Sequence, residues 1–408
     1  METTEFKIKY LTEKITKGTT PSNIGESFTD EGIMYFRSEL IGKTKFVDKS
    51  SGLLYISEST HEKLKRSQIK ENDMLFSMAG IYLGKISLVS SSDVPANTNQ
   101  AVAIIRFNSS NIDLNYVYYY MTQKWYNNYI NSLTAQAAQP NINLEQIGNL
   151  KINLPDVKIQ KNIAKIISRY DESIDNNNKR IKLLEQIAQN LYKEWFVRFR
   201  FPGWEKCEFE NGIPKGWHRK KIGFYYDTIS GGTPSRSHEE YFESGIYPWV
   251  KTGEIKDCII IDTEEYITKE AIKKSSAKLL PSKSVAMAMY GVNIGQLGYF
   301  DKQMTCNQAC CVFVDKRDFS SKHYLFQYLK SIREYLLLIS FGAAQQNLSQ
   351  DLIKKIKIVM PSDDVIKAFE EKVDMLYNSI KILMYKNRNL IQQRDLLLPR
   401  LMSGKLEV

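Results

Sequence analysis

The sequence predicts an α+β fold, in which two copies of one strand-rich domain are each followed by a long helix. The first observation is an internal repeat, because three short motifs of the first half return in the same order in the second half. The pairs are Thr20-Pro21-Ser22 with Thr233-Pro234-Ser235, Asn99-Gln100-Ala101 with Asn307-Gln308-Ala309, and Ala137-Ala138-Gln139 with Ala343-Ala344-Gln345. The separation falls from 213 to 208 to 206 residues along the chain. Such ordered drift indicates a tandem duplication with different loop insertions, whereas chance matches would scatter.

Within each copy, short strands are expected to precede one substantial helix and a last strand. In the first copy, residues 1–155, the expected strands are 33–36, 53–56, 73–78, 85–89, 101–107 and 150–154, and the helix is 114–133. In the second copy, residues 198–361 with a linker over 198–216, the strands are 247–251, 284–288, 298–300, 310–314 and 356–360, and the helix is 322–339. Such an order of elements is typical of the α+β class.

A pair of glycines recurs between two expected strands of each copy. Gly80 and Gly84 correspond to Gly291 and Gly295, which suits a turn that needs positive backbone φ angles. The alternative is a loop that cradles phosphate, but neither of the two common glycine-rich phosphate motifs surrounds these residues. We expect turns.

Each copy ends in a long helical pattern, which is the second observation behind the fold class. Pro155 and Pro361 each precede an N-cap candidate, Asp156 or Ser362, and then apolar residues at steps of three and four. Both patterns hold a heptad seam over about five heptads, which predicts a coiled coil. A helix of about 36 residues would span roughly 54 Å at about 1.5 Å per residue. We expect spacer helices over residues 156–197 and 362–408.

The two helices are expected to pair antiparallel about a pseudo-two-fold axis, with a domain at each end. Each seam contains one asparagine, Asn177 or Asn387, at positions that do not correspond in the repeat. In an antiparallel pair these amides could face each other and fix the register. The alternatives left open are that each amide binds water, and that each helix packs only on its own domain.

Composition predicts a cytoplasmic protein with full hydrophobic cores. Hydrophobic residues make up 43% of 408, no window of 18 uninterrupted apolar residues exists, and the first residues do not start a signal peptide. The five cysteines are Cys207, Cys258, Cys306, Cys310 and Cys311. Because their spacing matches neither a disulfide framework nor a zinc site, we expect reduced thiols and no metal.

The net charge of +10 is unevenly distributed. Residues 198–361 contain 24 Lys and Arg against 18 Asp and Glu, which is +6 of the excess. Nucleic acid is therefore the first partner to consider, although a membrane surface or plain solubility also fits the charge.

Catalytic motifs are missing from the sequence. Ile41-Gly42-Lys43-Thr44 looks like the end of a P-loop, but Arg37 occupies the place of its first glycine. The tetrapeptide of an amino-methyltransferase and the acidic strand of a nuclease are absent, and no histidine recurs at an equivalent position in the two copies. We therefore expect a binding protein. The alternatives are an enzyme on DNA with an unrecognised site, and an adaptor that joins two proteins.

Several segments closely resemble the specificity subunits of type I restriction-modification enzymes, and the resemblance covers essentially the whole chain. They are Ile213-Pro214 with Gly216-Trp217, the segment Ile229 to Ser235, Asn307-Gln308-Ala309, and the segment Leu191 to Gly203. The first copy departs from the pattern, because it lacks the lead-in before Thr20 and the glycine pair.

The resemblance implies a non-catalytic subunit with two target recognition domains on double-stranded DNA. Each domain would read one half of a bipartite target, and the helices would set the spacing and dock methyltransferase subunits that methylate adenine. S-adenosylmethionine, ATP and Mg²⁺ would act through the methyltransferase and motor-nuclease partners, and this chain would bind no cofactor. Readers related by a two-fold axis need half-sites roughly 10 base pairs apart, and two different copies imply an asymmetric target.

Residues that read bases should differ between the copies, and those that hold the backbone or the fold should recur. The recurring polar residues are Thr20, Ser22, Asn99, Thr233, Ser235 and Asn307. Arg and Lys recognise guanine, and Asn and Gln recognise adenine. The candidates for DNA contact are Arg37, Lys43, Lys45, Lys49, Arg236, Lys251, Lys256 and Lys273, with Gln139, Asn141, Gln345 and Asn347 from the Ala-Ala-Gln loops. For the cations a solvated surface charge, and for the amides a structural turn, remain open.

The end of the first helix is rich in aromatic residues. Trp195, Phe196, Phe199 and Phe201 are of the type enriched at interfaces and could dock a partner subunit. Equally, they could close the core where the helix meets the second domain.

Overall fold

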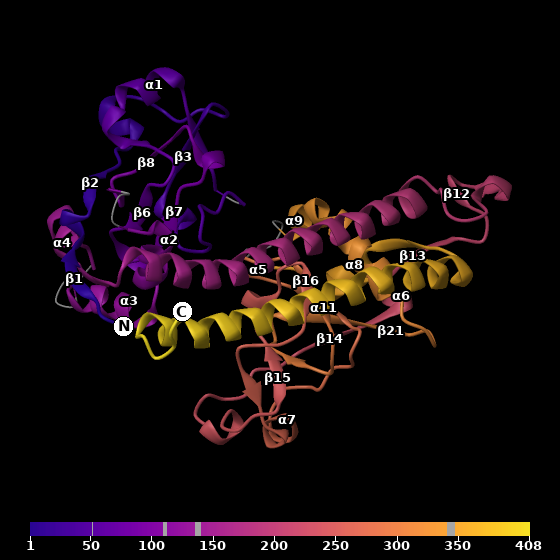
Figure 1. Ribbon diagram of the computed structural model, residues 1–408. Helices are drawn as coiled ribbons and strands as arrows, with labels where there is room; N and C mark the ends of the chain where they lie inside the picture. Colours follow the sequence, from indigo (N-terminus) through magenta and orange to yellow (C-terminus); the bar gives the residue numbers. More distant parts are fainter. Residues whose placement is uncertain (51, 109–111, 135–139, 341–346) are drawn as a thin grey trace. The chain divides into compact units, whose positions relative to one another are not determined.

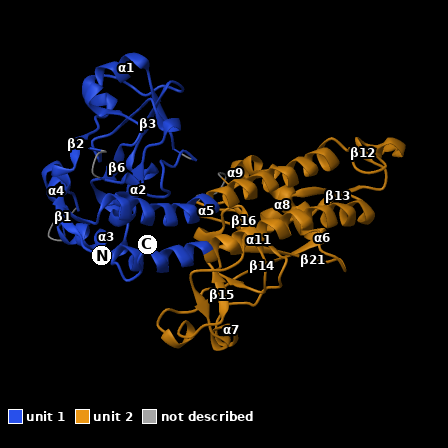
Figure 2. Ribbon diagram, in the orientation of Figure 1, with its two compact units in different colours: residues 1–174, 390–408 blue, residues 175–389 orange. Residues whose placement is uncertain are grey.

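The computed structural model describes residues 1–50, 52–108, 112–134, 140–340 and 347–408. The chain divides into two compact units (Figure 2), of which unit 1 comprises residues 1–174 and 390–408 and unit 2 comprises residues 175–389. The boundary between the units passes through both long helices, which are labelled α5 and α11 in Figure 1, so each unit contains one part of each helix (Figure 2).

Unit 1 is built on two four-stranded sheets of order β2-β9-β6-β7 and β4-β3-β8-β5, with a separate β1-β10 pair. The strands are β1 Thr4–Lys7, β2 Thr12–Lys17, β3 Ile33–Phe36, β4 Leu54–Ile56, β5 Gln68–Ile69, β6 Met74–Ser77, β7 Ile86–Leu88, β8 Ala96–Thr98, β9 Val102–Phe107 and β10 Lys151–Leu154. The central strands β6 and β9 are buried on both faces for most of their length, which explains their continuous apolar sequence. The six expected strands of this copy are all present.

The helices of unit 1 are short apart from the long one. They are α1 Glu58–Lys63, α2 Leu114–Met121, α3 Lys124–Ser132 and α4 Leu144–Asn149. The single helix expected over 114–133 is thus divided into α2 and α3. The Thr122 hydroxyl at the division donates to the Tyr118 carbonyl at 2.9 Å, a local bond that competes with helical pairing.

Unit 2 repeats this plan with more strands. Its sheets have the orders β14-β21-β18-β19-β16, β17-β15-β20, β13-β22 and β11-β12. The strands are β11 Phe209–Glu210, β12 Ile213–Pro214, β13 His218–Lys221, β14 Tyr226–Ser230, β15 Tyr247–Val250, β16 Cys258–Ile260, β17 Tyr266–Ile267, β18 Val285–Ala288, β19 Leu297–Phe300, β20 Thr305–Cys306, β21 Cys310–Asp315 and β22 Lys357–Met360. The short helices are α6 Ile222–Tyr225, α7 Lys269–Lys274, α8 Lys322–Ser331, α9 Arg333–Ser340 and α10 Gln350–Lys355. As in unit 1, the one helix expected before the last strand is divided in two.

The two long helices are α5 Val157–Tyr192, which continues as a π-helical turn over Lys193–Val197, and α11 Asp363–Met402. In unit 1, Ile163 near the start of α5 shares a core with Leu401 at the end of α11. In unit 2, Tyr192 at the end of α5 shares a core with Phe369 near the start of α11. A second contact in each unit has the same order, because Arg394 binds Asp171 in unit 1 and Asn177 binds Asn387 in unit 2. The helices therefore run antiparallel in each unit, and the prediction of an antiparallel pair is confirmed.

The asparagines of the two seams meet inside unit 2. The Asn177 side chain donates to the Asn387 Oδ1 atom at 2.8 Å, and the Asn387 amide donates in turn to the Asn178 Oδ1 atom at 2.8 Å. The predicted pairing of Asn177 with Asn387 is confirmed, with Asn178 as an additional member. Because the three amides satisfy one another in a mostly apolar seam, the arrangement favours one register of the helices.

The five cysteines all lie in unit 2. All five cysteines are free, and burial raises the pKa of the Cys311 thiol to about 12, so this thiol stays protonated near neutral pH. Within the described ranges, no group of three or more Cys, His, Asp or Glu side chains is placed to hold a metal ion. In the same part of the chain, no helix combines the length and the apolar character that crossing a membrane requires.

Candidate nucleic-acid interface

The repeated motifs form the same corner in each unit. The Thr20 hydroxyl donates to the Gln100 side-chain carbonyl, and the Thr233 hydroxyl donates to that of Gln308. Asn99, which precedes Gln100, is also held in place, because its side-chain oxygen accepts a hydrogen bond from the backbone amide of Ala101 at 3.1 Å. Asn307 accepts from the Ala309 amide in the same way at 3.2 Å. These contacts are consistent with a role in the fold for the recurring residues.

A glycine beside each corner is required by packing. A Cβ atom on Gly18 would lie 2.0 Å from the Thr98 carbonyl oxygen, and a Cβ atom on Gly231 would lie 2.0 Å from the Cys306 carbonyl oxygen. Any side chain at either position would push the two chain segments apart. Gln100 and Gln308 complete the corners, and sequence reasoning passed over them although both lie inside the repeated triplets.

Two of the four predicted cations of the first copy, Lys43 and Lys49, form close ion pairs. The ammonium of Lys43 lies 3.2 Å from the Asp48 carboxylate, and the ammonium of Lys49 lies 2.7 Å from the buried carboxylate of Asp93. These pairs close loops of unit 1, so a contact to DNA would have to compete with them. The Arg37 guanidinium forms a longer pair with the Glu39 carboxylate, at 3.9 Å.

The structure does not support Lys45 as a base reader. Its ammonium points into unit 1, where it lies 3.4 Å from the Tyr119 hydroxyl and 3.3 Å from the Ser168 hydroxyl of α5. Burial lowers the pKa of Lys45, although the carboxylate of Asp171 nearby opposes this effect. Lys45 thus ties its loop to α5.

In the second copy the predicted cations fall into two groups. Arg236 and Lys251 both bind the Glu265 carboxylate, at 2.6 and 3.0 Å, which locks them together. Lys256 and Lys273 are exposed, and neither has an acidic partner in the part of the chain that the structure describes. Of the four predicted cations of this copy, these two are exposed without an ion pair among the described residues.

The Ala-Ala-Gln loops end beside the glycine turns. Gln139 and Gln345 lie outside the described residues, whereas Asn141 and Asn347 are exposed and form bridges with Ala79 and Tyr290. The four glycines have φ angles of +67° and +77° in unit 1 and +84° and +76° in unit 2. The prediction of turns at these glycines is confirmed.

One strongly exposed apolar residue lies near the start of each turn. Ile81 is 86% exposed and Val292 is 100% exposed, and both follow the first glycine of their pair directly. Sequence reasoning missed these side chains. Their matching place between paired glycines is the signal that could have identified them.

Both copies of the domain match one family model. The model is described as the type I restriction modification DNA specificity domain, and it matches residues 1–186 and 214–393. The chain belongs to the type I restriction-modification specificity family. It is similar to the MjaIX specificity subunit of Methanocaldococcus jannaschii, with 24% identity over 98% of this chain and 93% of that protein. It is also similar to the HindI specificity subunit of Haemophilus influenzae, with 26% identity over 65% of this chain and 71% of that protein.

The fold agrees with this assignment. The crystal structure of the type I S subunit from M. genitalium superposes with a TM-score of 0.59 at 16% identity, covering 98% of this chain and 96% of that chain. By the family match, the chain is a type I specificity subunit with DNA recognition domains, which is a non-catalytic component of the restriction-modification complex.

The aromatic residues at the end of α5 pack in or against the core of unit 2. Trp195 is 5% exposed and Phe201 is 6% exposed, and Phe196 and Phe199 are half-buried. Phe196 packs against Phe369 at a ring distance of 4.8 Å. Of the two roles that the sequence left open for these four side chains, this packing corresponds to the closing of the core where the helix meets the second domain.

Other apolar side chains on the long helices do face outward. In unit 2, Leu183 and Ile187 lie one turn apart on the exposed surface of α5, and Met375 and Ile382 lie two turns apart on that of α11. None of these four belongs to the cores of unit 2. They are surface positions that the sequence analysis did not name.

Proposed function

We propose that each recognition domain reads one half of an asymmetric, bipartite DNA target, and that the two helices set the distance between the halves. The observation that carries this proposal is the contrast between the two copies. Each keeps the same corner, built on Thr20 or Thr233, whereas the loops beside it make different ion pairs, such as Lys49 with Asp93 in unit 1 and Arg236 with Glu265 in unit 2. A shared framework with different exposed loops suits two readers of different sequences.

The helices are proposed to dock methyltransferase subunits through their outward faces. The exposed apolar residues Leu183, Ile187, Met375 and Ile382 supply surface that a partner helix could cover. The proposed partners are methyltransferase subunits, which use S-adenosylmethionine to methylate adenine, and motor-nuclease subunits, which use ATP and Mg²⁺. This chain would contribute recognition in the cytoplasm, and it would bind none of these cofactors itself.

The decisive experiment is to express the chain with the methyltransferase encoded beside it and to map methylated adenines by single-molecule sequencing. The expected result is one bipartite motif with two different halves and a fixed gap. Replacing residues 1–155 by the corresponding domain of a relative should change one half and leave the other half and the gap unchanged. Methylation that is indifferent to this chain, or a change in both halves, would contradict the proposal.

Docking is tested separately with the double substitution Leu183→Glu and Ile187→Glu. Both side chains are exposed, so the fold should be kept, whereas binding of the methyltransferase in size-exclusion chromatography should be lost. Leu338→Glu is the matched control, because Leu338 is an equally exposed leucine on α9. If both variants bind the methyltransferase equally well, the docking surface lies elsewhere.

A further inference from the structure

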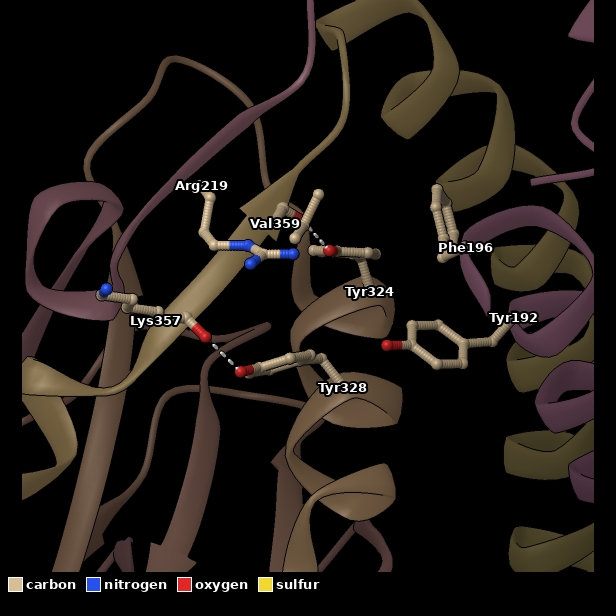
Figure 3. Close-up of a pocket in the computed structure, with 7 residues that line it drawn as sticks. All are labelled: Tyr192, Phe196, Arg219, Tyr324, Tyr328, Lys357 and Val359. Carbon is tan, nitrogen blue, oxygen red and sulfur yellow. Dashed lines mark hydrogen bonds between the residues drawn. The ribbon is translucent and has the colours of Figure 1, made fainter. Parts of the chain in front are cut away.

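A pocket of about 320 Å³ lies in unit 2, where the end of α5 meets α8, β13 and β22. It is lined by Tyr192, Phe196, Arg219, Tyr324, Tyr328, Lys357 and Val359 (Figure 3). The Tyr324 hydroxyl donates to the Val359 carbonyl, and the Tyr328 hydroxyl donates to the Lys357 carbonyl at 2.6 Å. Because these hydroxyls are bound to the backbone of β22, the rings are held in place as rigid apolar walls.

The strands at the mouth of the pocket are strongly cationic. Arg219 pairs with Val359 in the register of β13 and β22, and Lys221 stands directly opposite Lys357. Like charges opposite each other destabilise a strand pair. The neighbouring cations are Lys220 on β13 and Lys354 and Lys355 at the end of α10. In the described ranges of the chain, none of these six cations has an acidic partner.

The first copy of the domain serves as an internal comparison. Its strands β1 and β10 have the same register, with Glu5 opposite Asn153 and Lys7 opposite Lys151. There the Lys151 ammonium lies 2.8 Å from the Glu5 carboxylate. In the second copy Arg219 stands where Glu5 stands in the first. The ion pair of Glu5 with Lys151 in unit 1, which has no net charge, is thus replaced in unit 2 by two cations, Arg219 and Lys357.

Unit 1 also has a pocket at the corresponding corner, with a different composition. It measures about 530 Å³, and its lining includes Tyr120, Asn153 and Met402. Its cations, Arg400 and Lys405, come from the end of α11 and the turn that follows, and not from the strands. The cationic strand pair beside an aromatic pocket is therefore a feature of the second copy.

We propose that the unit 2 pocket binds an acidic protein segment that carries an aromatic or aliphatic anchor. The anchor would enter between the rings of Tyr192, Phe196 and Tyr328, and the carboxylates of the segment would pair with Arg219 and the lysines around it. Figure 3 shows the Arg219 side chain extending along β22 towards Tyr324, whereas the Lys357 ammonium points away from the pocket. Arg219 is thus the cation placed to bind a carboxylate beside the anchor, and arginine can do so with two hydrogen bonds.

The pocket favours a protein segment over DNA at this surface. Phosphates would satisfy the cations, but the backbone of a duplex has no apolar side chain to fill a cavity with aromatic walls. The inference goes beyond DNA recognition and docking on the helices. It concerns one further contact, made by unit 2 with an acidic chain.

The test uses the full chain and a fluorescein-labelled peptide of sequence Glu-Glu-Phe-Glu-Glu, with binding followed by fluorescence anisotropy. Arg219→Glu places a carboxylate beside Lys357, as Glu5 stands beside Lys151, so the fold should be kept. This substitution should weaken binding at least about tenfold, which corresponds to roughly 1.4 kcal/mol. Lys278→Glu is the control, because this substitution makes the same change in charge. Lys278 is exposed and has no acidic partner among the described residues. Its affinity for the peptide should stay close to that of the unaltered chain.

The place of binding is checked with a photoreactive phenylalanine at the centre of the peptide. Cross-links should map to the segments 192–196 and 324–328. The inference is overturned if the cross-links map elsewhere, if Arg219→Glu binds the peptide normally, or if the unaltered chain does not bind it at millimolar concentration. It is also overturned if a peptide with alanine at the centre binds equally well, or if Arg219→Glu weakens binding of duplex DNA and not of the peptide.

Discussion

At the scale of single residues, ion pairing separates the cations that are free to meet DNA from those that hold the fold. The sequence identifies Lys45 and Lys256 as equivalent candidates, because both are lysines in loops. In the structure Lys45 contacts the Ser168 hydroxyl of α5, whereas Lys256 is exposed. The difference depends on partners that are far away in the sequence, such as Ser168, and a loop pattern contains no information about them.

We predict that Lys256→Ala and Lys273→Ala each weaken binding of target DNA by the specificity subunit. A lysine that neutralises one phosphate should also lower the slope of log affinity against log salt concentration by about one. The measurement is a salt titration of duplex binding by fluorescence anisotropy. Lys45→Ala is the control and should leave both the affinity and the slope unchanged, because its ammonium faces α5. An unchanged slope in all three variants would show that other residues contact the phosphates.

A second prediction at this scale concerns stability in acid. Burial lowers the pKa of His323 to about 4, and its Nε2 atom lies 2.8 Å from the Asp374 carboxylate, beside the Lys322 ammonium. Between pH 6.5 and about 4, the unfolded chain binds a proton at His323 that the folded chain does not bind. The neutral imidazole therefore contributes to the free energy of unfolding above this pH range. This contribution is lost as the pH falls through the range, and the total loss is about 3 kcal/mol.

The measurement is urea unfolding at several pH values. In His323→Gln the loss between pH 6.5 and about 4 should be smaller than in the unaltered chain, because the group that gains the proton is gone. The exposed His218 provides the control, and His218→Gln should follow the unaltered chain. Parallel curves for all three proteins would show that His323 does not determine the acid response.

At the scale of elements, the long helices are the part of the fold that the sequence predicts best. A seam of apolar residues over five heptads has few alternative structures, and two matching seams make a pair. The strands β1 and β2 were missed because their sequences, Thr4–Lys7 and Thr12–Lys17, are mostly charged or polar and show little alternation of apolar residues. The division of each short helix was missed as well, because at Thr122 it depends on a local hydrogen bond and not on periodicity.

The amide cluster of the helix pair leads to a prediction about this element. Asn387→Ala removes the partner of both Asn177 and Asn178 in a half-buried seam, so it should destabilise unit 2 by about 1–3 kcal/mol. The double variant Asn177→Leu and Asn387→Leu should recover most of this loss, because it removes the partly buried polar groups together. The measurement is urea unfolding at neutral pH. Asn176→Ala is the control, because Asn176 is exposed on the same helix. An effect of Asn387→Ala no larger than that of Asn176→Ala would contradict the structural role of the cluster.

At the scale of the whole molecule, the duplication can be read from the sequence and the division into units cannot. The repeat places each helix after its own domain, at Pro155 and Pro361. The structure instead gives each unit the start of one helix and the end of the other, because Leu401 packs in the core of unit 1 and Trp195 in the core of unit 2. Which core receives the end of a helix is decided by packing across more than 200 residues of sequence, roughly the separation of Ile163 and Leu401. Motif spacing alone could not show it.

The same division provides a test of the helices as a spacer. The unit boundary crosses α5 after Ile174 and α11 after Asn389, so seven residues inserted at each point lengthen both helices at the boundary. A full heptad keeps the apolar seam continuous. Seven residues at about 1.5 Å each add roughly 10 Å, which corresponds to at most about three base pairs at about 3.4 Å per step.

Methylation mapping should therefore return the same two half-sites with a gap longer by up to about three base pairs. An insertion of two residues at each point, which rotates the seam by about 200°, should abolish methylation. A gap unchanged by the heptad insertion would mean that the helices do not set the distance between the half-sites.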